Sequence, residues 1–129
     1  MSEMLEYFKS QQQAMVDLLT EMVKHESFTR DKAMVDKLVD FVAGQFVSLP
    51  ADSVVRYPQE EVGDFLLAKW NEDAPGKPIL FMVHIDTVHP TNSLATMPIK
   101  IEEGRLYGPG AVDMKGGVVI ALEAIRGLQ

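Results

Sequence analysis

The sequence contains no cysteine, and this absence excludes disulfide bonds and thiolate metal ligands. Basic residues are also scarce: 12 Lys and Arg stand against 19 Asp and Glu, and the formal net charge is −7. Such a balance argues against a nucleic-acid partner, which would require clustered positive charge. Apolar runs stay far below the roughly 20 residues of a membrane-spanning helix, so we expect no membrane partner. Any metal bound by this chain is therefore held by His, Asp and Glu.

The remaining composition is that of a folded protein. The 129 residues are 47% hydrophobic and 24% charged, close to the average for a globular domain, and the length suits a single domain. The first residues, Met1 to Met4, lack the basic and then apolar layout of a secretory signal. Together with the absence of cysteine, this leads us to expect a cytoplasmic location.

Apolar residues recur at helical intervals in three segments. The first runs from Glu3 to about Lys24 and predicts one helix. The second carries its apolar residues over 35–46, with Thr29 as the candidate N-cap and Pro50 just beyond its end. The third runs from residue 115 to residue 128 and is apolar on most sides, which predicts a buried helix.

Short segments of strand-forming residues lie between the second and third helices. Ser53–Tyr57 and Asp64–Trp70 are separated by a polar turn, and residues 99–101 and 105–107 flank a Glu-Glu-Gly turn that predicts a hairpin. Ile79–Val83 is a continuous apolar run, typical of a central strand that is covered on both faces. Helices, then strands, then a helix predict a layered α/β fold with a mixed sheet.

Polar residues follow directly after the apolar run, where α/β proteins commonly place their active sites. In an extended chain His84 and Asp86 point to the same face, because residues i and i+2 lie side by side. A carboxylate in that place can accept the second ring N–H of a metal-bound imidazole. The spacing alone is weak evidence for a metal site and favours a His and an Asp that only hydrogen-bond within a loop.

A second cluster, residues 108–117, places glycines on both sides of Asp113 just before the last helix. This arrangement indicates a strained turn that aims the carboxylate into a cleft, although a purely structural Gly-rich turn fits as well. A nucleotide-binding loop does not fit, because Asp113 replaces a required glycine and Lys115 precedes Gly116 instead of following it. Together, the two clusters offer one imidazole and two carboxylates, a ligand set suited to Zn²⁺.

The two motifs are HIDTV at residues 84–88 and GRLYGPGAVDMKGG at residues 104–117. In this order they resemble the zinc exopeptidase family of glutamate carboxypeptidase, acetylornithine deacetylase, succinyl-diaminopimelate desuccinylase and aminoacylase. The helical segments ahead of the first motif are also similar. The resemblance implies a three-layer α/β/α catalytic domain with a mixed, mainly parallel sheet. Residues 1–129 would be its N-terminal part, with the rest of that domain and a dimerisation domain outside this sequence.

The resemblance assigns a role to each matching residue. His84 matches a ligand of one zinc ion, and Asp113 matches the carboxylate that bridges two zinc ions, with Co²⁺ or Mn²⁺ as possible substitutes. Asp86 matches the catalytic-site acid that orients His84. The peptide bond between Asp113 and Met114 matches a position that is cis in the family. His25 and His89 match no ligand position, and we expect them at a helix end and in a solvated loop.

The chain also departs from the family pattern. The family's Glu-Glu pair, which supplies the general base and a zinc ligand, lies downstream of the second motif, as do a further acidic ligand and a final His ligand. Only 16 residues follow Asp113 here, and Glu123, within the apolar helix, is the only acid among them. We therefore expect this chain to supply only part of the metal site.

Two function hypotheses follow. The resemblance implies a zinc-dependent metallopeptidase, either a carboxypeptidase or an N-acyl-amino-acid amidohydrolase. It would use activated water to cleave an amide or peptide bond next to a free carboxylate. Its substrate would be a small peptide or an N-acyl amino acid, and the full-length protein a homodimer, with the isolated chain inactive. The alternative is a non-catalytic module that serves as a binding or assembly subunit.

Overall fold

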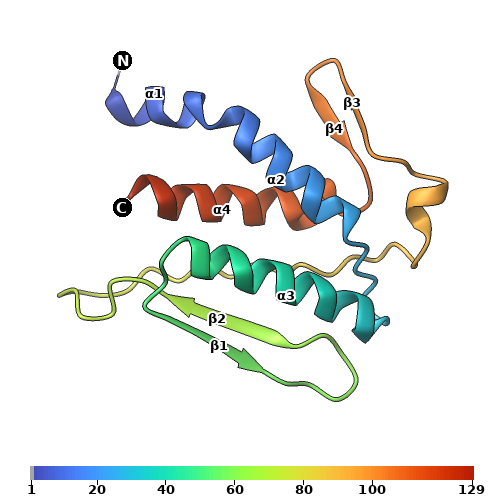
Figure 1. Cartoon of the computed structure of the whole chain (residues 1–129), viewed down its shortest axis with the longest axis horizontal. Coiled ribbons are helices and arrows are strands. Elements are labelled where there is room, and N and C mark those ends of the chain that lie inside the picture. The colour runs from blue at the N-terminus through green and yellow to red at the C-terminus, as the bar shows by residue number, and fades with distance from the viewer. Residues whose placement is uncertain (1) are drawn as a thin grey trace.

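A computed structural model describes residues 2–129 (Figure 1). Helices and strands are mixed, as the sequence predicts. The helices are α1 (Glu3–Ser10), α2 (Gln12–Lys24), α3 (Lys32–Ser48) and α4 (Gly116–Gly127), and the strands are β1 (Ser53–Tyr57), β2 (Phe65–Lys69), β3 (Lys100–Glu102) and β4 (Arg105–Tyr107). A short 3₁₀ turn, Ser93–Ala95, and a π-type turn, Ala111–Lys115, complete the elements.

The core lies where three helices meet. Helix α4 runs alongside α1 and α2, and α3 lies on its other side in the view of Figure 1. Buried apolar side chains from α2, from α3 and its C-cap Leu49, and from α4 contact one another there: Met22, Leu38, Val42, Leu49, Val118, Val119 and Leu122. Apolar residues at helical spacing in all three predicted helices thus contribute to the core.

The first predicted helix is broken in two. At Gln11 the backbone turns (ψ −3°) and α1 gives way to α2, so the prediction of one continuous helix is wrong. The Ser10 hydroxyl donates to the Tyr7 carbonyl at 2.6 Å and competes for an acceptor that the helix ladder would use. The N-cap of the next helix is also corrected. Asp31, not Thr29, caps α3 by accepting a hydrogen bond from the Met34 N–H at 3.2 Å.

The hairpin predicted over residues 99–107 forms, and the two strand segments predicted before it pair as a second hairpin. Strands β1 and β2 pair antiparallel against α3, with Val55 opposite Leu67, and β3 pairs antiparallel with β4. The β3–β4 turn uses Glu103 and Gly104, both at positive φ (51° and 74°), the conformation that two-residue hairpin turns favour.

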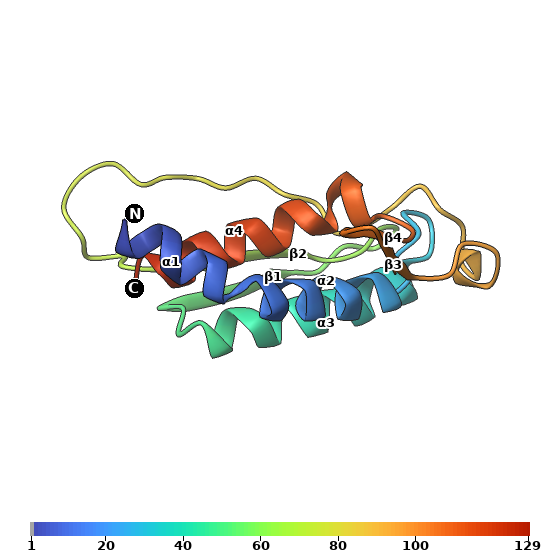
Figure 2. The same cartoon turned by 90° about the horizontal axis from the view of Figure 1, so that it is seen from above.

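The predicted buried strand Ile79–Val83 is absent from this chain. The five side chains are between 43% and 83% exposed, and the segment has no strand assignment. Figure 2 shows residues 71–83 arching away from β1 and β2. A strand needs neighbouring backbone to pair with, and within residues 2–129 no strand lies beside this run. The sheets formed by the described residues are therefore the two antiparallel hairpins. No helix among these residues is long and apolar enough to cross a bilayer.

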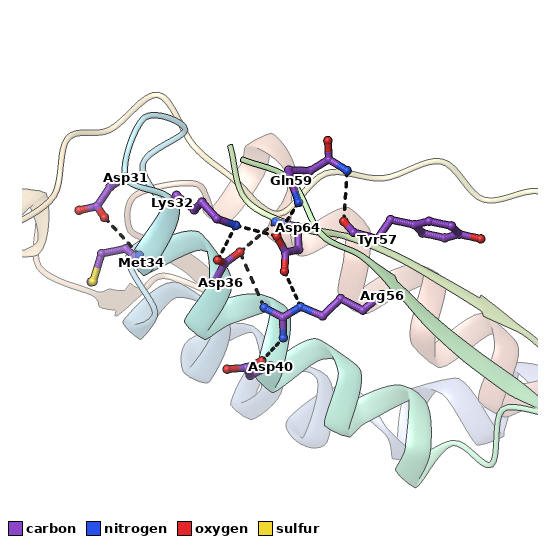
Figure 3. A network of polar contacts seen from close by, with 9 residues as sticks. All are labelled: Asp31, Lys32, Met34, Asp36, Asp40, Arg56, Tyr57, Gln59 and Asp64. Atoms are coloured by element: carbon purple, nitrogen blue, oxygen red, sulfur yellow. Dashed lines mark hydrogen bonds and ion pairs between the residues drawn. The ribbon is translucent and has the colours of Figure 1, made fainter. Parts of the chain in front are cut away.

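Ion pairs between charged side chains connect the β1–β2 hairpin to α3 (Figure 3). The Asp64 carboxylate accepts hydrogen bonds from Lys32 Nζ at 2.6 Å, from the Gln59 N–H at 2.9 Å and from Arg56 Nε at 2.6 Å. Arg56 also contacts Asp40 on α3. The Lys32 ammonium, followed by these other donors, holds the pKa of Asp64 well below its usual range.

We expect this network to make stability sensitive to acid. Since the folded-state pKa of Asp64 is depressed, its contribution is present above the unfolded-state pKa of about 3.9 and is lost as pH falls towards the folded value. Urea denaturation between pH 7 and pH 2 will show a steep loss of stability below about pH 4. Asp64→Asn will be less stable at pH 7 and will lose less on acidification. Equal acid sensitivity in both proteins would contradict this role.

Candidate metal centre

The first motif is held by a short parallel bridge between segments 27–29 and 85–87. The Thr87 N–H donates to the Ser27 carbonyl at 2.8 Å, and the Thr29 N–H donates to the Thr87 carbonyl at 2.9 Å. The buried Ser27 hydroxyl donates to the Ile85 carbonyl at 2.8 Å. These bonds fix the backbone on both sides of Asp86, although the strand predicted before it does not form.

His84 lies against Asp86, as the spacing predicts. Its Nδ1 is 3.1 Å from the Asp86 carbonyl oxygen and 3.3 Å from Asp86 Oδ1. Both contacts favour a proton on Nδ1, which leaves the Nε2 lone pair free for another partner.

The second motif brings Asp113 to the other side of the same ring. Nε2 of His84 lies 3.0 Å from Asp113 Oδ1, although the two residues are 29 positions apart. Asp113 sits in the turn Ala111–Lys115, which begins after Gly110 at φ +73°. The Asp113–Met114 peptide bond is cis, as the family resemblance implies. The structure thus brings together all three residues that the sequence singled out: His84, Asp86 and Asp113.

The carboxylates change the acidity of the ring. Partial burial of His84 opposes its charged form, but hydrogen bonds to the Asp86 carbonyl and the Asp113 carboxylate outweigh it and raise the pKa of the imidazole. The same hydrogen-bond contact holds the Asp113 carboxylate beside the ring at 3.0 Å.

The donor atoms fit zinc in kind. An imidazole nitrogen and a carboxylate oxygen are common Zn²⁺ ligands, and two ligands on one tetrahedral ion lie roughly 3.3 Å apart, close to the 3.0 Å between Nε2 and Oδ1. The Asp113 side chain is 83% exposed, so its oxygens are open to a cation. Within residues 2–129, however, no group of three or more His, Asp or Glu side chains is arranged to hold a metal. The described residues thus bring together the two side chains that the sequence proposes as metal ligands.

Lys115 lies under the turn and is fully buried. Its ammonium donates to the His25 carbonyl at 2.7 Å, and burial lowers the pKa of Lys115 to about 8 while the nearby Glu26 opposes that shift. Lys115 therefore has a structural role: it connects the second motif to the end of α2. His25 does end α2, and its ring contacts Phe41.

The sequence did not identify two residues, Thr29 and Glu26, as neighbours of the site. The Thr29 hydroxyl donates to Asp86 Oδ2 at 2.6 Å, and the Glu26 carboxylate accepts from the N–H groups of Asn92 and Leu94 at 2.9 and 3.0 Å. No periodicity could reveal contacts between residues so far apart. Glu123, which the family comparison disfavoured as a match for the Glu-Glu pair, accepts a hydrogen bond from the Tyr7 hydroxyl at 2.9 Å, away from the site.

The two motifs also match a known family. Residues 80–129, which contain both motifs and α4, match the model of peptidase family M20/M25/M40. The fold is also similar to that of a known protein. The chain superposes on human carnosine dipeptidase 1 with a TM-score of 0.83 at 23% identity, over 97% of this chain and 30% of that one. Residues 80–129 therefore match this peptidase family in sequence, and the chain shares the fold of the dipeptidase, so the resemblance drawn from the motifs is confirmed.

Individual relatives are hydrolases. Carboxypeptidase G2 from Pseudomonas sp. (strain RS-16) is 31% identical over 118 residues, which is 90% of this chain and 28% of that protein. A succinyl-diaminopimelate desuccinylase from Helicobacter pylori (strain J99) is 54% identical over 46 residues, which is 34% of this chain and 12% of that protein. The chain thus spans less than a third of the length of the relatives it matches.

Proposed function

We propose that this chain supplies the N-terminal part of the catalytic domain of a zinc-dependent hydrolase. The reaction would be cleavage of an amide or peptide bond next to a free carboxylate, in a small peptide or an N-acyl amino acid. One observation carries the proposal: His84 Nε2 and Asp113 Oδ1 lie 3.0 Å apart at an open surface, with Asp86 behind the ring. The family match over residues 80–129 supports it.

Each residue has a distinct part in this proposal. His84 and Asp113 would hold the metal, with Asp113 shared between two ions, and Asp86 would keep the imidazole in the orientation that presents Nε2. Zinc, or Co²⁺ or Mn²⁺ in its place, would supply Lewis acidity and an acidified water. The general base and the remaining ligands would come from a later part of a longer protein.

The exposed run Ile79–Val83 supports a larger fold. Five consecutive apolar side chains are costly in water, and such runs are typical of strands that are covered on both faces. We propose that they form a central strand of a three-layer, mainly parallel sheet in a longer protein. That protein would be a cytoplasmic homodimer without nucleic-acid or membrane partners.

The test compares this chain with the product of the whole reading frame that encodes it. After reconstitution with Zn²⁺, the longer protein is expected to hydrolyse N-acyl amino acids and dipeptides, and to fail on the matched substrates whose carboxylate is amidated. The 129-residue chain is expected to bind Zn²⁺ weakly and to hydrolyse nothing. A reading frame that stops at Gln129, or equal rates on both substrates of a matched pair, would contradict the proposal.

A binding or assembly module remains the second candidate for the isolated chain. The observation that favours it is the two-ligand site, since residues 2–129 hold no group of three metal ligands. This role would predict that the chain binds a partner equally well with and without a chelator.

A further inference from the structure

Asp86 is held by a residue that lies far from it in the sequence. Its Oδ1 faces His84 Nδ1 at 3.3 Å, while its Oδ2 accepts a hydrogen bond from the Thr29 hydroxyl at 2.6 Å. Each carboxylate oxygen therefore has one named partner. The bridge between segments 27–29 and 85–87 fixes the backbone, but the Asp86 side chain could still rotate about its own bonds. The hydrogen bond from Thr29 restricts that rotation.

The Thr29 side chain is itself fixed. Its N–H donates to the Thr87 carbonyl at 2.9 Å, and its hydroxyl lies 3.0 Å from that same carbonyl oxygen. The backbone bond sets the distance between Thr29 and Asp86, and the β-branched side chain has few rotamers. The hydroxyl hydrogen then points to the nearer and charged acceptor, Asp86 Oδ2, which gives the stronger bond.

We infer that Thr29 is a positioning residue for the metal site: it orients Asp86, and Asp86 in turn keeps the His84 proton on Nδ1. This inference rests on the proposed function, in which Nε2 is the atom that binds zinc. Two acceptors of Asp86 compete for the ring proton with a single oxygen of Asp113. The Asp86 side chain is 33% exposed and the Asp113 side chain 83% exposed, so water weakens the Asp113 contact more.

The experiment uses the 129-residue chain labelled with ¹⁵N and free of metal, at a pH where the His84 ring is neutral. Long-range ¹H–¹⁵N spectra distinguish a proton on Nδ1 from one on Nε2. We expect the Nδ1–H form in the unaltered chain and in Thr29→Ser, which keeps the hydroxyl. Thr29→Val keeps the shape but loses the hydroxyl, and we expect it to populate both forms.

Zinc affinity is the second readout, measured by competition with a chromophoric chelator. We expect Thr29→Val to bind about 10-fold more weakly than the unaltered chain, the effect typical of losing an outer partner of a metal ligand, and Thr29→Ser to recover most of the affinity. Thr91→Val is the matched control, because Thr91 donates to Asp31 Oδ2 at 2.7 Å outside the site. It is expected to change neither readout.

Each outcome decides the inference. An unchanged His84 tautomer in Thr29→Val, or a failure of Thr29→Ser to restore the Nδ1–H form, would overturn it. A tautomer shift without weaker zinc binding would overturn the link to the metal. Thr29→Ala also removes the hydroxyl and replaces Thr29→Val if that variant does not fold. We expect it to cause the same shift of the His84 tautomer. Zinc binding that is unchanged by His84→Ala would instead refute the proposed function, while the metal-free spectra still decide the role of Thr29.

Discussion

Replacing Gly110 with alanine is expected to destabilise the chain by about 2–5 kcal/mol, from two additive causes. Gly110 has φ +73°, a conformation that costs an L-residue about 1–2 kcal/mol. A Cβ at this position would also lie 2.3 Å from Thr87 Cγ2, within the bridge that holds the first motif. Urea denaturation of Gly110→Ala measures the sum, and the His84 ring signals report whether the two motifs still meet.

Gly104 offers a matched control for this prediction. It has nearly the same φ, +74°, but a Cβ there would meet nothing within 4 Å. Gly104→Ala is therefore expected to show the backbone cost alone, about 1–2 kcal/mol. Thr87→Ser removes the methyl group that a new Cβ would strike, and we expect it to recover part of the loss in Gly110→Ala. Equal losses in the two glycine variants would show that the Gly110 contact with Thr87 is unimportant.

His84→Ala is expected to weaken zinc binding by the chain more than about 100-fold, because loss of an outer partner alone typically costs 10- to 100-fold and this change removes a ligand. In the longer protein that we propose, the same change is expected to abolish hydrolysis. The measurement is competition with a chelator for the chain, and initial rates for the longer protein.

The control for this change is His89→Ala. His89 lies five residues later in a loop, and its own N–H donates to Thr87 Oγ1 at 3.2 Å. Its substitution removes an imidazole without touching the pair formed by His84 and Asp113. Equal losses of zinc affinity in His84→Ala and His89→Ala would contradict the assignment of His84 as a ligand.

Local sequence features predicted much of the fold. The β1–β2 and β3–β4 hairpins follow from strand-forming residues around short polar turns, whose contacts lie close in sequence. The helical stripes predicted the core of α2, α3 and α4 for the same reason. The prediction of a strand at Ile79–Val83 is wrong for this chain. A buried strand depends on neighbouring strands from elsewhere in the protein, and the described residues provide none beside it.

The site was predictable only in part. The spacing of His84 and Asp86 placed them together, since that relation is local. The meeting of His84 with Asp113 followed from the family resemblance, not from spacing. The contact of Thr29 with Asp86 joins residues 57 positions apart, and the sequence instead predicts Thr29 as a helix cap because threonine is favoured just before a helix.

We propose above that His84 and Asp113 bind one metal ion between them. The most direct test is a crystal of this chain soaked in Zn²⁺ and measured on both sides of the zinc absorption edge. We expect an anomalous peak about 2.0–2.2 Å from both His84 Nε2 and an Asp113 carboxylate oxygen. Zinc bound only elsewhere, with His84 and Asp113 still hydrogen-bonded to each other, would contradict it.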